Sequence, residues 1–85
     1  MHKVKLSTKA QKDLKHLART VIYDKIVAVL HELSRDPYSG DIKCLTTHKL
    51  ADWRKRVGDY RILYDIENKK KEVHILRIWR RGHGY

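Results

Sequence analysis

The chain has 85 residues, a length that allows one compact domain with one hydrophobic core. Twenty lysines and arginines against ten acidic residues give a formal net charge of +10, which points to an anionic partner such as nucleic acid, the ribosome, a membrane surface or an acidic protein. The single cysteine, Cys44, excludes an intramolecular disulfide and a cysteine-based zinc cluster. Because the sequence contains neither a signal-peptide core nor an apolar run of the length that spans a membrane, we expect a cytoplasmic protein with one domain, residues 1–85.

The first half of the chain predicts a short strand followed by two helices. Residues 2–6 alternate polar and apolar side chains, as in a short strand. Ser7 or Thr8 can cap a first helix, and Thr20 can cap a second helix with an apolar stripe of about four turns. The second helix should end before Pro37, because the residue that precedes a proline disfavours the α region. The short connection between the helices predicts an αα-hairpin.

The second half predicts three strands after an irregular stretch, residues 38–50. The strand segments are rich in β-forming residues and are separated by turns at Gly58-Asp59 and at residues 68–71. These segments are residues 53–57, 60–66 and 73–79. Consecutive strands with short turns favour an antiparallel meander. We therefore expect an α+β domain of order β-α-α-β-β-β, in which a two-helix hairpin packs on a twisted antiparallel sheet of about four strands.

Three arginines form the first candidate site. Arg54 and Arg56 are two residues apart on one predicted strand and so share a face. A tight turn at Gly58-Asp59 brings Arg61 alongside them on the next strand. Guanidinium groups bind phosphate in a bidentate manner, and like charges opposed on a sheet cost stability unless an anion lies between them. The alternative is a solvated strand face of a basic protein.

The C-terminal tail is the second candidate site. Arg80 and Arg81 could stabilise a pentavalent phosphate, His83 could transfer a proton near neutral pH, and Tyr85 could stack on a base or act in acid–base chemistry. The alternative is a frayed basic terminus. Among the other histidines, His48 is an accessory candidate because it precedes the arginine strand, and none has the spacing of metal ligands.

Several catalytic signatures are absent from the sequence. There is no phosphate-binding glycine loop, no nucleophile elbow and no pair of carboxylates near the arginines, so Mg²⁺-dependent hydrolysis is disfavoured. RNA offers another route, since its own 2′-OH can attack the adjacent phosphate when a base takes the proton and cations stabilise the phosphorane. We expect no metal and no cofactor.

Three segments resemble the toxins of one family. Residues 53–64, WRKRVGDYRILY, are similar to the aromatic-basic-x-basic-V-G-D-Y-R segment of RelE-type toxins, and residues 78–85 resemble that family's closing H-R-x-x-x-Y pattern. Residues 36–41 and 43–45 match a further family segment. The chain is thereby identified as a RelE-like member of the RelE/ParE superfamily of type II toxins. This resemblance implies a microRNase-like fold and metal-free cleavage of mRNA in the ribosomal A site. It also implies an antitoxin encoded alongside, whose complex binds operator DNA.

The resemblance assigns roles to individual positions. Arg61 and Arg81 would stabilise the phosphorane, while Arg54 or Arg56 would orient the phosphate or help the 2′-OH to lose its proton. Tyr85 would stack on the base or assist that transfer, and His83 would protonate the leaving oxygen. Arginine is a poor general base because it does not deprotonate in proteins, which moves the base role toward His83. The expected RNA-contacting residues are Arg54, Lys55, Arg56, Arg80 and His48.

Two alternatives remain open at the level of sequence. ParE-type toxins of the same superfamily inhibit DNA gyrase and generally lack the full basic-plus-tyrosine site, so that site favours the nuclease. A nucleic-acid-binding module without chemistry would have the same charge pattern.

Overall fold

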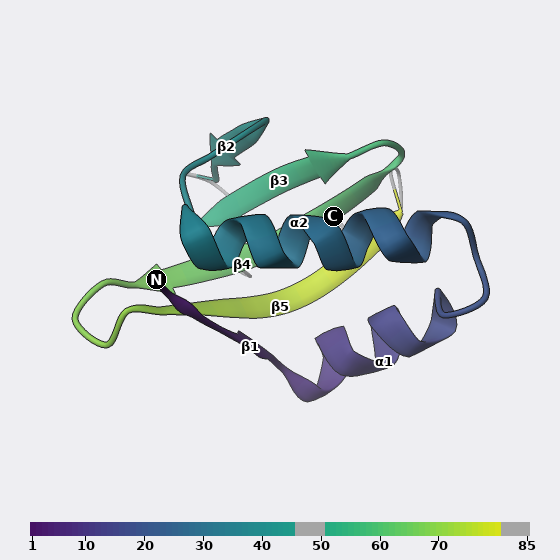
Figure 1. The fold of residues 1–85 in the computed structure, drawn as a ribbon, viewed down its shortest axis with the longest axis horizontal. Coiled ribbons are helices and arrows are strands. Elements are labelled where there is room, and N and C mark those ends of the chain that lie inside the picture. Colours follow the sequence, from purple (N-terminus) through teal and green to yellow (C-terminus); the bar gives the residue numbers. More distant parts are fainter. Residues whose placement is uncertain (46–50, 81–85) are drawn as a thin grey trace.

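A computed structural model describes residues 1–45 and 51–80 and contains a five-stranded sheet with two helices (Figure 1). The elements in chain order are β1 (Lys3–Leu6), α1 (Thr8–His16), α2 (Ile22–Arg35), β2 (Ile42–Cys44), β3 (Trp53–Val57), β4 (Tyr60–Glu67) and β5 (Glu72–Arg80). The expected α+β class is confirmed. Neither α1 nor α2 has the length and apolar character needed to cross a membrane.

The sheet differs from the expected four antiparallel strands in two details. Its order is β1-β5-β4-β3-β2, and β1 runs parallel to β5 while the other pairs are antiparallel. The added strand, β2, falls in the stretch expected to be irregular. With three residues paired to β3 alone, it is too short for an alternating pattern to reveal it.

The helix caps follow one expectation and depart from another. Ser7 caps α1, since its hydroxyl oxygen accepts a hydrogen bond from the Ala10 amide at 3.0 Å. Thr20 does not cap α2. The N-cap position is Val21, without a side-chain hydrogen bond, and the Thr20 hydroxyl donates instead to the Leu17 carbonyl at 2.8 Å.

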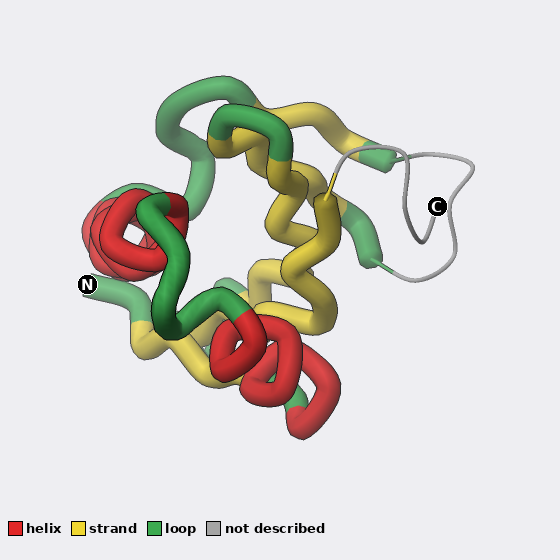
Figure 2. Tube along the Cα trace, turned by 90° about the vertical axis from the view of Figure 1, so that its right-hand side faces the viewer, coloured by secondary structure: helices red, strands yellow, loops and turns green. Residues whose placement is uncertain are grey.

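The core lies between the helices and one face of the sheet, which we call the helix face; α1 contributes Ala10 and its C-cap residue Leu17. In Figure 1 α2 lies in front of the strands and α1 lies beyond the end of β1, and Figure 2 shows α2 almost end-on, on one side of the sheet. Three fully or largely buried residues of α2 recur at helical spacing and pack on buried strand residues. The helix residues are Ile26, Leu30 and Leu33, and the strand residues are Val57, Ile62, Tyr64, Val73, Ile75 and Ile78. Burial of each large apolar side chain contributes about 1.5–3 kcal/mol.

A β-bulge in β5 changes which side chains point away from the helices. Leu63 pairs with Arg77 and Tyr64 pairs with Ile75, so Leu76 is an extra residue opposite this step. Before the bulge Ile75 lies on the helix face, and without it Arg77, two residues later, would lie there too. The extra residue instead turns Arg77 to the opposite face.

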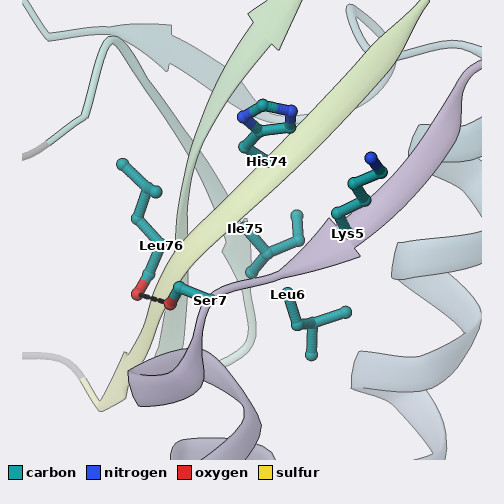
Figure 3. Close-up of a pocket in the computed structure, with 6 residues that line it drawn as sticks. All are labelled: Lys5, Leu6, Ser7, His74, Ile75 and Leu76. Atoms are coloured by element: carbon teal, nitrogen blue, oxygen red, sulfur yellow. Dashed lines mark hydrogen bonds between the residues drawn. The ribbon is translucent and has the colours of Figure 1, made fainter.

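The edge of β5 is closed by α1 where β1 ends. Figure 3 shows Ser7 at this point, with its hydroxyl donating to the Leu76 carbonyl at 2.8 Å. Further along, the Ile78 amide donates to Asp13 Oδ2 at 2.9 Å. The side chains of Ser7, the N-cap of α1, and of Asp13 within α1 thus bind backbone groups of β5 beyond its pairing with β1, which fixes the position of this helix beside the strand end.

Candidate nucleic-acid interface

Three arginines share the face of the sheet opposite to the helices, which we call the arginine face. Arg56 lies directly opposite Arg61 in the register of β3 and β4, and Arg54 lies two residues before Arg56 on the same face. The juxtaposition expected from the Gly58-Asp59 turn is therefore present. Since β2 pairs Lys43 with Arg54, a fourth cation belongs to this face.

The three arginines differ in their surroundings. Arg61 is only 7% exposed, and its Nη1 donates to the Tyr60 carbonyl at 3.2 Å. Arg56 is exposed and its Nε lies 3.7 Å from Asp41 Oδ2. Arg54 is half-buried, and its Nη1 is a buried donor without an acceptor among residues 1–45 and 51–80. A buried donor without a partner costs about 1–3 kcal/mol, so an anion on this face would relieve an unfavourable arrangement.

Lys55 does not belong to the arginine face. It lies on the helix face, 4% exposed, with Nζ 3.3 Å from Glu32 Oε2 and 3.5 Å from Ser39 Oγ. A Cβ added to Gly40 would lie 2.9 Å from Lys55 Cε and Nζ, and Gly40 has a φ of +80°, so the turn closes tightly over the lysine. Lys55 therefore fastens β3 to α2 and this turn, and we do not retain it among the RNA-contacting residues.

The remaining candidates divide between described and undescribed parts of the chain. Arg80 is exposed at the end of β5, opposite Tyr60. The others lie outside the described residues: His48, Arg81, His83 and Tyr85. In the described part of the chain, no three His, Cys, Asp or Glu residues are grouped as a metal site would require.

The arginine face also contains an ion pair that the sequence did not predict, between Arg77 and Asp13. Arg77 donates from Nε and Nη2 to the two carboxylate oxygens of Asp13, at 2.8 and 3.0 Å, and its Cζ lies 4.5 Å from the centroid of the Trp79 ring. The hydrogen bonds to Asp13 raise the pKa of Arg77. Asp13 and Arg77 are 64 positions apart, so no local spacing could have paired them.

An ion-pair cluster lies on β1 and β5. Glu72 binds Lys5 Nζ at 2.8 Å and His74 Nε2 at 2.9 Å. Hydrogen bonds from Lys5 and then from His74 lower the pKa of Glu72 from 4.5 to about 2. The carboxylate is thus committed to fastening the parallel edge strand, which gives this cluster a structural role.

Comparison with known proteins identifies similarity to type II toxins. Residues 4–85 match the family model described as the ParE toxin of the type II toxin–antitoxin system parDE. A search of curated proteins gives no match.

Solved structures share the fold over nearly the whole chain. A chain of the RelBE2 toxin–antitoxin complex from Mycobacterium tuberculosis is 32% identical, with a TM-score of 0.81 over 94% of this chain and 98% of that one. A chain of the archaeal RelE–RelB complex from Pyrococcus horikoshii is 28% identical, with a TM-score of 0.78 over 98% of both chains. The isolated E. coli RelE toxin is 15% identical, with a TM-score of 0.78 over 99% of this chain and 88% of that one, a likeness of fold alone.

Proposed function

The chain belongs to the RelE/ParE superfamily of type II toxins, and we propose that it is a ribosome-dependent endoribonuclease that cleaves mRNA in the A site and so inhibits translation. The observation that carries this proposal is the arginine face, where Arg56 lies opposite Arg61 and beside Arg54. Three guanidiniums on one sheet face suit a phosphate in a geometry that a diffuse basic surface does not offer.

The proposed reaction uses the nucleophile that RNA supplies. The 2′-oxygen attacks the adjacent phosphorus and the bond to the 5′-oxygen breaks, which leaves a 2′,3′-cyclic phosphate and a 5′-hydroxyl. A base removes the 2′ proton, an acid protonates the leaving oxygen, and cations stabilise the phosphorane. This route needs no metal and no cofactor.

Each arginine suits a different part of this reaction. Arg61 is buried and held by the Tyr60 carbonyl, so it can present a fixed positive charge to the phosphorane without reorganisation. Arg54 and Arg56 would orient the phosphate. We assign the remaining roles to the tail by its motif: Arg81 as a second phosphorane stabiliser, His83 as the acid or base, and Tyr85 as a stacking partner of the base. His48 is the second choice for the base.

The proposed partners follow from the family and the charge. Solved relatives are toxin–antitoxin complexes, and we propose an antitoxin with an acidic segment that covers the arginine face. Binding to operator DNA would occur through that complex, in the cytoplasm. Arg56 of the arginine face is exposed on the outer face of the sheet, so we expect the ribosome to supply part of the substrate's orientation and free RNA to be cut poorly.

A second candidate function is inhibition of DNA gyrase. The observation in its favour is the family description, which names the ParE toxin. A third candidate is nucleic-acid binding without chemistry, which the charge of +10 would equally support.

The deciding experiment is primer extension on mRNA from a translating extract. It compares the wild-type chain with Arg56→Ala and with the double variant Arg81→Ala/Tyr85→Phe. Lys25→Ala is the matched control, because it removes one exposed cation from α2, away from the arginine face. We expect new 3′ ends inside ribosome-occupied codons with the wild type and the control, and none on naked mRNA.

The outcomes separate the three functions. Loss of cutting in the two site variants, with the control unaffected, supports the nuclease. Growth arrest without any cut would overturn it in favour of gyrase inhibition, which a supercoiling assay tests directly. Neither cuts nor growth arrest would leave a binding module.

A further inference from the structure

A groove lies where the first turn of α1 meets the end of β5. Its volume is about 590 Å³, and it is lined by Ser7, Thr8, Lys9, Leu76, Arg77 and Trp79. The groove adjoins the arginine face, because Trp79 lies directly opposite Arg61 in the register of β4 and β5. A polynucleotide on the arginines would therefore reach this groove with a neighbouring nucleotide.

The groove contains a guanidinium that is fixed in position. Arg77 is tied by two hydrogen bonds to Asp13, whose Oδ2 also accepts from the Ile78 amide at 2.9 Å. Its Cζ lies over the Trp79 ring, 4.5 Å from the ring centroid. A side chain held by an ion pair and a ring contact has little conformational entropy left to lose when a ligand binds.

The contacts already made by Arg77 determine what it can still bind. Asp13 takes the Nε and Nη2 donors and neutralises the charge, so Arg77 is a poor ligand for a phosphate. The Cζ of Arg77 lies over the Trp79 ring, yet the side chain of Arg77 remains 24% exposed. An exposed guanidinium plane is a surface on which a nucleobase stacks.

Lys9 supplies a positive charge to the groove, where the charge of Arg77 is neutralised by Asp13. It is exposed, it lines the same groove, and it lies in the first turn of α1, which contains no acidic residue. A phosphate one step from the stacked base would meet this ammonium and the positive end of the helix dipole.

We propose that this groove is a nucleotide subsite for single-stranded RNA, in which a base stacks on the plane of Arg77 and the adjoining phosphate contacts Lys9. Asp13 and Trp79 act as positioning residues, since they fix the guanidinium without pairing to the base. The subsite rests on the proposed function in that it binds a nucleotide flanking the one to be cleaved. It accepts any base, because every base has a π-face.

The test is binding of a short, fluorescein-labelled 2′-O-methyl oligoribonucleotide, which cannot be cleaved by 2′-OH attack. Fluorescence anisotropy compares the wild type with Arg77→Lys, which keeps the charge beside Asp13 and removes the plane. We expect Arg77→Lys to bind about tenfold more weakly. We expect Lys9→Gln to lower the slope of log K against log[salt] by about 0.7, while Lys25→Gln on α2 leaves this slope unchanged.

Abasic oligonucleotides identify the stacked base. With an abasic residue at the position that reaches the groove, wild type and Arg77→Lys should bind equally, because the interaction lost in the variant is already missing. A tenfold difference that persists for every abasic position would overturn the proposal. Equal binding of intact RNA by wild type and Arg77→Lys would also overturn it and leave the groove to a protein partner.

A folding control and a comparison of binding with cleavage allow the subsite and the nuclease to be tested separately. Thermal unfolding of each variant, compared with the wild type, identifies any loss of affinity that comes from a loss of folding. Binding that depends on Arg77 without cleavage in the translating extract would retain the subsite and remove the enzyme. Cleavage in the translating extract, with RNA binding that does not depend on Arg77, would retain the enzyme and remove the subsite.

Discussion

Arg56 has one neighbour of like charge and one of opposite charge. Arg61 lies across from it in the sheet register, and Asp41 Oδ2 lies 3.7 Å from its Nε. Both members of the Arg56–Asp41 pair are exposed, so the pair adds little to stability. Its more important effect is on binding, because the Asp41 carboxylate competes with a phosphate for the Arg56 guanidinium.

The substitution Asp41→Asn should therefore strengthen RNA binding. We expect a several-fold gain in affinity for a 2′-O-methyl oligoribonucleotide and a steeper salt dependence, because Arg56 becomes free for a phosphate. Fluorescence anisotropy at several salt concentrations measures both. The control is Asp24→Asn, which removes an exposed carboxylate from α2. An equal gain in the control would mean that only net charge matters.

Lys55 tests the separation of the two faces of the sheet. It lies between two arginines in sequence, yet it is buried on the helix face against Glu32. Lys55→Met should keep the fold, because methionine fills the space of the lysine stem and half-exposed Glu32 can be solvated. We expect the free energy of unfolding to change by less than about 1.5 kcal/mol in urea titration.

RNA binding by the same variant gives the sharper result. Lys55→Met should weaken oligonucleotide binding no more than Lys25→Met, an equal loss of charge at an exposed position of α2. A distinctly larger loss would return Lys55 to the RNA-contacting set.

At the scale of the elements, the carboxylate of Glu72 adds an ion pair to the parallel ladder that joins β1 to β5. Lys5 and His74 lower the pKa of Glu72 from 4.5 to about 2. A carboxylate with a depressed pKa in the folded state stabilises that state fully above its unfolded value and loses this contribution as the pH falls through the folded value. The contribution of Glu72 should therefore disappear between pH 4.5 and about 2.

The variant Glu72→Gln should be less stable than the wild type near neutral pH and equal to it near pH 2. Urea midpoints measured across this range should show a flatter acid limb for the variant. Glu67→Gln, an exposed neighbour on β4, is the control. A difference between wild type and Glu72→Gln that stays constant down to pH 2 would mean that the pKa of Glu72 is not lowered in the folded protein.

The elements also mark where sequence reasoning succeeds and fails. The register of Arg56 with Arg61 was predictable, because a tight turn at Gly58-Asp59 leaves only one local pairing. The bulge at Leu76 was not predicted, although strict alternation from Val73 and Ile75 would have placed the charged Arg77 on the buried face. Such a break in the alternation indicates an irregularity but not the residue at which it occurs.

The whole molecule adds contacts that no window of sequence contains. The ion pair of Asp13 with Arg77 and that of Glu32 with Lys55 each join a helix of the first half to a strand of the second half. Local patterns predict elements and their nearest neighbours, whereas these contacts depend on how α1 and α2 settle against the sheet. Such contacts decide which of the chain's many cations are available to RNA.

The net charge of +10 admits two physical situations at this scale. If the charge acts diffusely, single substitutions of basic residues should be interchangeable. If RNA sits on the arginine face, the contacts of Arg54, Arg56 and Arg61 should together give a slope of log K against log[salt] of about −2 or steeper for single-stranded RNA. Anisotropy titrations with the 2′-O-methyl oligoribonucleotide at four or more salt concentrations measure this slope.

Variants that each remove one positive charge distinguish the two situations. Arg56→Ala should reduce the slope by about 0.7, and an equal loss of charge at Lys25 should leave it unaltered. Equal reductions in both would mean that the whole basic surface attracts RNA without a defined path. A reduction confined to Arg56 would mean that the fold has concentrated the recognition of phosphate on the arginine face, where Arg56 is exposed, while Lys55 is buried on the helix face.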